Sequence, residues 1–248
     1  GPASFALLAA AHKGALVINQ VTMSSINSMV VPSFSRVKKR DDLGNLFIKM
    51  VTITALLVLP IFMGLAAVAD PFVTIAFGDK FAPSAEFMAI SAFTMFPGVV
   101  AWFLPNLLIA SGKTNDAFKL TLLNLISNIL VAGATIWFGI KFMLISLVVA
   151  SFISLPIRIF IVNKHVSIDS KRLFSSLVPP SFSALSMYFL LIAIKPHITN
   201  WVNSDVLSLI LLIASGALIY PFMYITLFFG HAKVQLNELK EMLASKKR

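Results

Sequence analysis

The stretch FALLAAAHKGALVINQVTMSSINSMVV, from Phe5 to Val31, decides how the rest of the sequence is interpreted. It is long enough to cross a bilayer, for which about 20 predominantly apolar residues suffice. It is also more polar than every other long apolar run of the chain, because it carries a lysine, a histidine and several amide and hydroxyl side chains. We therefore predict a membrane-spanning helix with one polar face.

The polar side chains of this predicted helix share one side. At about 100° per residue, six of them fall within an arc of about 140°: His12, Lys13, Asn19, Gln20, Ser24 and Asn27. A spanning helix does not turn such a stripe to lipid, so the stripe lines either a helix interface or a water-filled cavity. Both interpretations stay open. The lysine favours the cavity, because a cation near the bilayer centre costs about 3 kcal/mol.

Composition predicts an all-α polytopic membrane helix bundle. The 248 residues are 58% hydrophobic and 12% charged, with a mean hydropathy of +0.90, whereas soluble domains carry about 25% charged residues. The net charge of +10 does not indicate a nucleic-acid partner, because the basic residues sit in short loops without an aromatic-interleaved face. The absence of cysteine excludes disulfides, thiol catalysis and thiolate metal sites. No signal peptide precedes the first apolar run, and we expect the chain to be a fragment.

Seven membrane spans are predicted within one membrane domain, residues 1–229, followed by a basic cytoplasmic tail, residues 230–248. Short polar or turn-rich segments separate the spans, and no long linker divides the chain. The spans are Phe5–Val31, Leu46–Ala69, Ser84–Ser111, Lys119–Phe138, Phe142–Asn163, Leu173–Ile194 and Val206–Phe229.

The loops alternate in charge. All Lys and Arg residues except Lys13, Lys80, Lys141 and Lys195 fall on one side of the predicted bundle; we assign Arg158 to a loop of that side. Because cytoplasmic loops of membrane proteins carry the excess of basic residues, we expect the N-terminus outside and the C-terminus in the cytoplasm.

Two features of the spans bear on movement and binding. The third span holds Pro97 and Pro105, so it is expected to bend, either as a hinge or merely to suit packing. The fourth span carries Asn124 and Asn128 four residues apart, on one helical face. They either hydrogen-bond to a neighbouring helix or belong to a binding site.

Chemistry typical of enzymes is absent from the predicted spans. Every carboxylate lies in a loop, at the end of a span or in the tail, and the histidines lack metal-ligand spacing. Asp70 and Asp79 flank an outer loop, where turn capping explains them better than paired catalysis. We therefore predict no catalytic residues, no metal and no cofactor. A cation beside neutral polar groups instead suits an anionic, hydroxyl-rich ligand such as a sugar phosphate.

The first part of the chain resembles a family in the order of its short motifs. These are Pro32-Ser33-Phe34-Ser35-Arg36, Leu59-Pro60, Gly64-Leu65, Asp70-Pro71, Phe77-Gly78-Asp79-Lys80-Phe81, Ser84-Ala85 and Leu108-Ile109-Ala110-Ser111-Gly112-Lys113. Their order is similar to that in the C-terminal half of bacterial polysaccharide flippases of the MATE-like superfamily, which move lipid-linked oligosaccharides of O-antigen and exopolysaccharide. The resemblance is specific over about residues 1–113; beyond that it consists of hydropathy and loop length.

The resemblance implies helices eight to fourteen of a fourteen-helix flippase, with the N-terminal lobe of the same protein missing. It implies a multi-pass protein of the bacterial inner membrane that flips an undecaprenyl-diphosphate-linked oligosaccharide for polysaccharide or lipopolysaccharide biosynthesis. The expected partners are that substrate, the bilayer and the missing lobe. Lys13 would attract the diphosphate, and the other expected substrate-binding residues are His12, Asn19, Gln20, Asn27, Asn124 and Asn128.

Three alternatives stay open from the sequence. One is a multidrug exporter of the same superfamily, which a buried carboxylate in the missing half would favour. Another is a membrane-embedded polysaccharide-assembly enzyme, which a large outer loop with paired acids would favour. The third is a non-transporting scaffold, in which the polar stripe would contact a partner helix.

Overall fold

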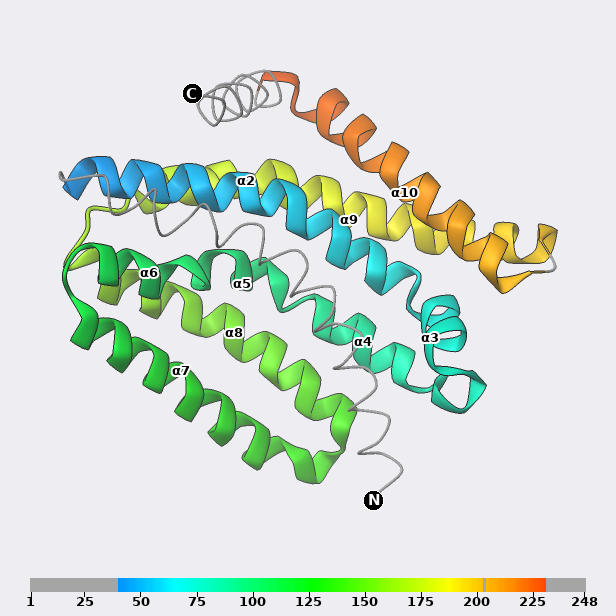
Figure 1. The fold of residues 1–248 in the computed structure, drawn as a ribbon, viewed down its shortest axis with the longest axis horizontal. Helices are drawn as coiled ribbons and strands as arrows, with labels where there is room; N and C mark the ends of the chain where they lie inside the picture. The colour runs from blue at the N-terminus through cyan, green and yellow to red at the C-terminus, as the bar shows by residue number, and fades with distance from the viewer. Residues whose placement is uncertain (1–39, 203, 231–248) are drawn as a thin grey trace.

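A computed structural model describes residues 40–202 and 204–230, and all secondary structure in these ranges is helical (Figure 1). The predicted first helix, with Lys13, His12, Asn19, Gln20 and Asn27, lies outside the described residues, as does the basic tail from residue 231 onward. The elements are α2 (Arg40–Ala67), α3 (Ala69–Phe77), η1 (Asp79–Phe81), α4 (Ser84–Ala92), α5 (Met95–Ala101), α6 (Phe103–Ala110), α7 (Thr114–Thr135), η2 (Ile136–Phe138), α8 (Ile140–Asn163), α9 (Ser170–Trp201) and α10 (Asp205–Leu227).

Six of the seven predicted spans fall on described residues, and each coincides with a helix or a series of helices. Five described helices are long and apolar enough to cross a membrane, or six if the bent α4–α6 segment counts as one span. The sixth predicted span, Leu173–Ile194, was too short, because α9 begins at Ser170 and continues through Pro196 to Trp201. The chain is therefore a polytopic helix bundle of the kind found in membranes.

The bundle is built around α2. Figure 1 shows α2 and α9 side by side along the length of the molecule, with α10 at one edge and α7 at the opposite edge. About two thirds of the apolar part of α2 is buried, against 6% for α7. The fully buried Phe47, Phe62 and Phe103 belong to the central core, whereas Phe118 and Leu130 of α7 are about two thirds exposed. Such outer apolar faces suit contact with lipid rather than water.

The third predicted span is bent, as the prolines indicated. It is divided into α4, α5 and α6, with a bend of 46° between α4 and the rest. At the break, the amide of Thr94 donates to the carbonyl of Ser91 and that of Phe96 to that of Phe93, three residues back rather than four. Pro97 follows at once; without an N–H it cannot donate to Phe93, so the α-helical ladder cannot run through this turn.

Two glycines let neighbouring helices pack as they do: Gly112 in the α6–α7 turn, and Gly44 within α2. Gly112 ends α6 with a φ of +75°, which side chains rarely adopt, and the next amide, of Lys113, donates to the carbonyl of Leu108. This turn brings α7 back alongside α6. At Gly44 of α2, an added Cβ would lie 2.0 Å from the carbonyl oxygen of Ser167, so only glycine lets the α8–α9 connection approach α2 this closely.

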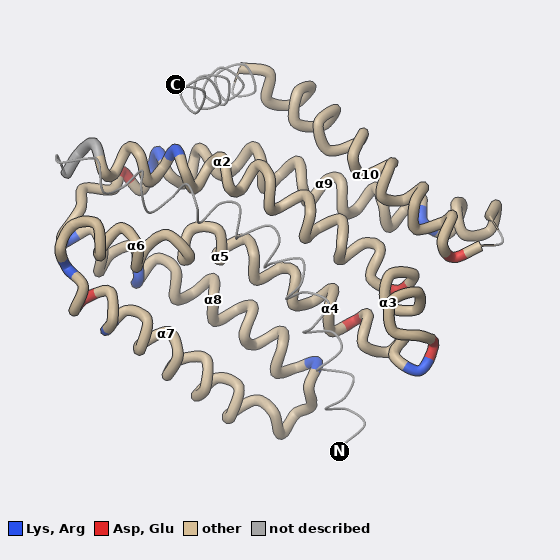
Figure 2. The backbone as a smooth tube through the Cα atoms, in the orientation of Figure 1, with Lys and Arg blue, Asp and Glu red and all other residues tan. Residues whose placement is uncertain are grey.

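Charges gather at the two ends of the bundle (Figure 2). Lys and Arg predominate at the end that holds the α6–α7 turn and the α8–α9 connection, whereas the end with α3 and η1 carries both acidic and basic residues. This distribution matches the charge asymmetry of the sequence, and which end faces the cytoplasm stays a prediction.

Candidate functional site

A polar cavity of about 980 Å³ lies between the bent span and the α7–α8 hairpin. It opens to the surface and is lined by residues of α5, α6, α7 and α8, together with the break before α5. The lining residues that carry polar side chains are Thr94, Trp102, Asn106, Thr121, Asn124, Asn128, Ser151 and Arg158. Polar groups inside a bundle of apolar helices are costly unless a partner or a ligand satisfies them, which makes this cavity the candidate site.

Arg158 is the one charged side chain among the described residues that line the cavity. We counted Arg158 among the loop charges although it falls within the predicted fifth span, Phe142–Asn163; the structure places it in the helix, so the loop assignment is wrong. Apolar residues continue on both sides of it, so α8 extends to Asn163 and carries Arg158 five residues before its end. The guanidinium is half-buried and donates a hydrogen bond to the side-chain oxygen of Asn124 on α7.

Asn124 and Asn128 lie together on the cavity face of α7, as their spacing predicted. The amide nitrogen of Asn128 is 3.5 Å from the side-chain oxygen of Asn124, at the limit of a hydrogen bond. The oxygen of Asn124 therefore faces two donors, one on its own helix and the guanidinium of Arg158 on α8. A row of amide and guanidinium groups runs along this wall of the cavity.

Three hydroxyl groups of the cavity donate their hydrogen bonds to the backbone. Thr94, Thr121 and Ser151 each donate to a backbone carbonyl of the preceding turn, at 2.6, 2.9 and 2.6 Å. Their protons are thereby used, and their oxygens remain able to accept hydrogen bonds. Guanidinium and amide donors thus suit an anion, while the hydroxyl oxygens suit the O–H groups of a sugar.

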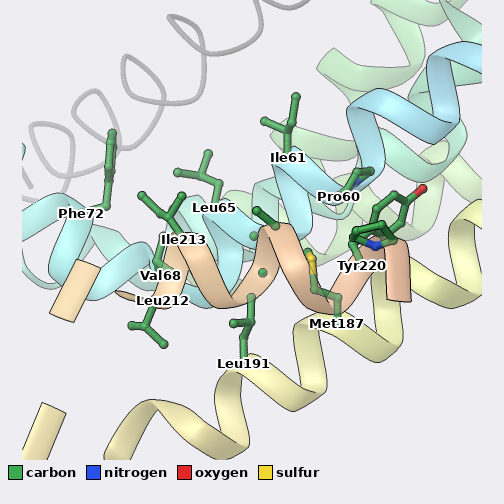
Figure 3. Close-up of a pocket in the computed structure, with 14 residues that line it drawn as sticks. Pro60, Ile61, Leu65, Val68, Phe72, Met187, Leu191, Leu212, Ile213 and Tyr220 are labelled. Carbon is green, nitrogen blue, oxygen red and sulfur yellow. The ribbon is translucent and has the colours of Figure 1, made fainter. Parts of the chain in front are cut away.

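Two further cavities between described helices differ from it in chemistry. One, of about 430 Å³, lies between α2, α9 and α10 (Figure 3) and is lined by apolar side chains such as Leu65, Leu191 and Ile213. Its one hydroxyl, on Tyr220, donates to the carbonyl of Leu56 at 3.0 Å. The other, of about 370 Å³, is lined largely by aromatic and aliphatic side chains between α5, α8 and α9. Neither lining includes a charged residue.

Several other charged groups of the described chain pair at the ends of the bundle. Lys195 of α9 bonds to Asp70 of α3, and Lys141 of α8 pairs with Glu86 of α4 at 2.5 Å. Asp70 is thus an ion-pair partner at the start of α3, and no side-chain capping hydrogen bond is seen there, so the predicted turn capping by Asp70 is wrong. The described residues contain no group of three or more acidic, histidine or cysteine side chains that suits a metal ion.

Two of the seven predicted site residues, Asn124 and Asn128, therefore fall on described residues and meet in one cavity. Arg158 and Asn106 were missed. Asn106 comes from the bent span, and its amide donates to the carbonyl of Trp102 at 3.3 Å. A usable signal for Arg158 was present, since a charge within an apolar run long enough to span a membrane is expensive unless it has a partner.

A family model described as "polysaccharide biosynthesis protein" matches residues 1–86. The matched region covers the predicted first helix, α2, α3, η1 and the start of α4. No curated protein and no solved structure matches the chain. The match supports a role in polysaccharide biosynthesis and agrees with the region in which the sequence resembles the flippases.

Proposed function

We propose that this protein transports a lipid-linked oligosaccharide bearing a diphosphate from the cytoplasmic to the outer leaflet of the bacterial inner membrane. The polysaccharide family match supports the pathway. The single observation that carries the transport step is the guanidinium of Arg158 in a polar cavity, within a bundle whose outer helices expose apolar side chains.

The charge of the cavity favours an anionic substrate. Arg158 meets no carboxylate within ion-pair distance among the described residues, so its charge remains to be matched by a ligand. A guanidinium presents five N–H donors in a fork that fits two phosphate oxygens at once. The diphosphate of a lipid-linked sugar supplies such oxygens.

The position of Arg158 suits loading from one leaflet. It lies about 7.5 Å from the end of α8, at 1.5 Å per residue, on the basic end of the bundle. If that end is cytoplasmic, as the charge count predicts, the guanidinium sits near the phosphates of the cytoplasmic leaflet. Farther from that end, Asn128 of α7 and Ser151 of α8 then face the sugar, and the lipid tail stays in the bilayer.

The bent span provides a route for alternating access. Thr94, Pro97 and Asn106 all line the cavity, so a change in the bend between α4 and α5 changes its shape. In this proposal the missing lobe closes the cavity from the other side, and the two lobes rock about it. The polar stripe predicted for Phe5–Val31, with Lys13, adds a second source of polar groups and stays a prediction.

The test is restoration of surface polysaccharide in a flippase-deficient bacterium by the full-length protein. We expect Arg158→Gln to abolish most of the restoration and Arg158→Lys to keep part of it, because lysine retains the charge but not the fork. Arg172→Gln is the matched control. Arg172 lies at the same basic end but bonds to Asn45 at 2.9 Å outside the cavity, so its loss should be tolerated.

The amount of each variant in the membrane is measured in the same cells. Full restoration by Arg158→Gln at normal protein level would refute the proposed role of the cavity. Drug resistance conferred by the protein, with no effect on polysaccharide, would instead favour the multidrug exporter.

A further inference from the structure

The side chain at position 124 is the hydrogen-bond acceptor that holds the guanidinium of Arg158. Asn124 accepts a hydrogen bond from Arg158 across the α7–α8 interface, from a residue 34 positions farther along the chain. The acceptor is an amide oxygen, which is neutral, so the guanidinium is held in place without being neutralised. Arg158 also makes no ion pair with any other described residue.

The hydrogen bond leaves most of the guanidinium available. One N–H group points to Asn124, and the guanidinium has four more donors. The amide nitrogen of Asn128 is 3.5 Å from the same oxygen, which adds a second contact to the Asn124 side chain. The guanidinium fork is thereby oriented before any ligand arrives.

We propose that Asn124 is a positioning residue that gives the cavity its preference for anionic ligands, by holding Arg158 without cancelling its charge. This inference rests on the proposed function. An aspartate at the same position has nearly the same shape and accepts the same hydrogen bond. It would also form an ion pair with Arg158, leaving the pair without net charge and presenting a carboxylate to any phosphate.

A purely structural role for Asn124 predicts the opposite order of variants. If the residue only joins α7 to α8, Asn124→Asp strengthens that bond and should work at least as well as the wild type, whereas Asn124→Leu removes it and should be worse. If the residue preserves the charge of Arg158, Asn124→Leu leaves the charge free and should bind anions better than Asn124→Asp. The two explanations are therefore separated by the rank of two variants of similar size.

The experiment measures binding of inorganic diphosphate to the full-length protein in lipid nanodiscs by isothermal titration calorimetry at low salt. We expect Asn124→Asp to bind at least about tenfold more weakly than the wild type, equivalent to about 1.4 kcal/mol. Asn124→Leu should lose only a few-fold, through poorer orientation of the guanidinium. Thermal unfolding of each variant without ligand reports any loss of helix packing separately.

Asn128→Asp is the matched control, since it adds the same charge to the same cavity one helical turn away. It should weaken binding less than Asn124→Asp, because Asn128 does not bond to Arg158 in this structure. Equal losses at both positions, or wild-type binding by Asn124→Asp, would overturn the positioning role while leaving the proposed transport intact. Absence of binding by the wild type, with full polysaccharide restoration by Arg158→Gln, would overturn both proposals.

Discussion

The bend of the third span is predicted to depend on Pro97, and Pro97→Ala should straighten it. Alanine restores an N–H at position 97, which can donate to the carbonyl of Phe93 four residues back. The break between α4 and α5 would thereby gain the α-helical hydrogen bond that it now lacks. The bend to be reduced is 46°.

The expected size follows from the local geometry and energetics. One added hydrogen bond contributes about 1 kcal/mol, and proline in a helix interior is about 3 kcal/mol worse than alanine. The straighter form should therefore gain about fivefold to 150-fold in population relative to the bent one. With 1.5 Å of rise per residue along both arms, straightening by about 25° lengthens the separation of residues 82 and 109 by about 2 Å.

Pulsed electron paramagnetic resonance measures this separation between spin labels on cysteines introduced at Ala82 and Ile109. Both positions are exposed, and the chain has no native cysteine to interfere. Pro156→Ala is the matched control, because Pro156 lies inside the continuous helix α8 and its loss should leave the separation unchanged. We also expect Pro97→Ala to reduce polysaccharide restoration, since Pro97 lines the cavity whose shape the bend sets.

An unchanged distance distribution in Pro97→Ala would refute this reasoning. It would show that packing of α4 against α2 and α8 imposes the bend, and that proline merely tolerates it. A shift of the same size in Pro156→Ala would also contradict the argument, because it would place the effect outside the break.

Two further predictions concern stability, measured by thermal unfolding in detergent. Gly44→Ala should destabilise the protein by about 1 to 3 kcal/mol, because its Cβ would lie 2.0 Å from the backbone oxygen of Ser167; Gly133→Ala, with open space around it in α7, should be neutral or stabilise by up to about 1 kcal/mol. Equal effects at the two glycines would contradict the close approach at Gly44. Tyr220→Phe should cost about 1 kcal/mol, because Leu56 of α2 loses the hydrogen bond that the hydroxyl of α10 donates; an unchanged midpoint would show that this bond adds nothing to the α2–α10 contact.

Much of the fold followed from hydropathy and local chemistry. The apolar runs predicted the positions of the six spans that fall on described residues, and the paired prolines predicted which of them bends. The spacing of Asn124 and Asn128 predicted one helical face, and both line the same cavity. These features depend on residues close together in the sequence, where helix periodicity and proline chemistry act directly.

The ends of helices and the contact partners of individual side chains were harder to predict from the sequence. Arg158 was counted with a loop, although it falls within a predicted span, because basic residues near span ends normally serve topology. Whether such a residue faces a cavity or the lipid headgroups depends on the neighbouring helix. Similarly, α9 extends beyond its predicted ends and carries three prolines within one helix. This longer helix packs against α2 and α10. The low helix propensity of its three prolines would by itself disfavour it.

The sequence by itself therefore determined the class of protein, the span positions and the charge asymmetry, because each follows from the cost of placing particular side chains in a bilayer. Only the tertiary structure decided that α2 packs along α9, more than a hundred residues away, and that Arg158 of α8 meets Asn124 of α7. Apolar helices are nearly equivalent in hydropathy, so their pairing depends on the shapes and hydrogen bonds of particular side chains. Those contacts are made between residues that no local pattern connects.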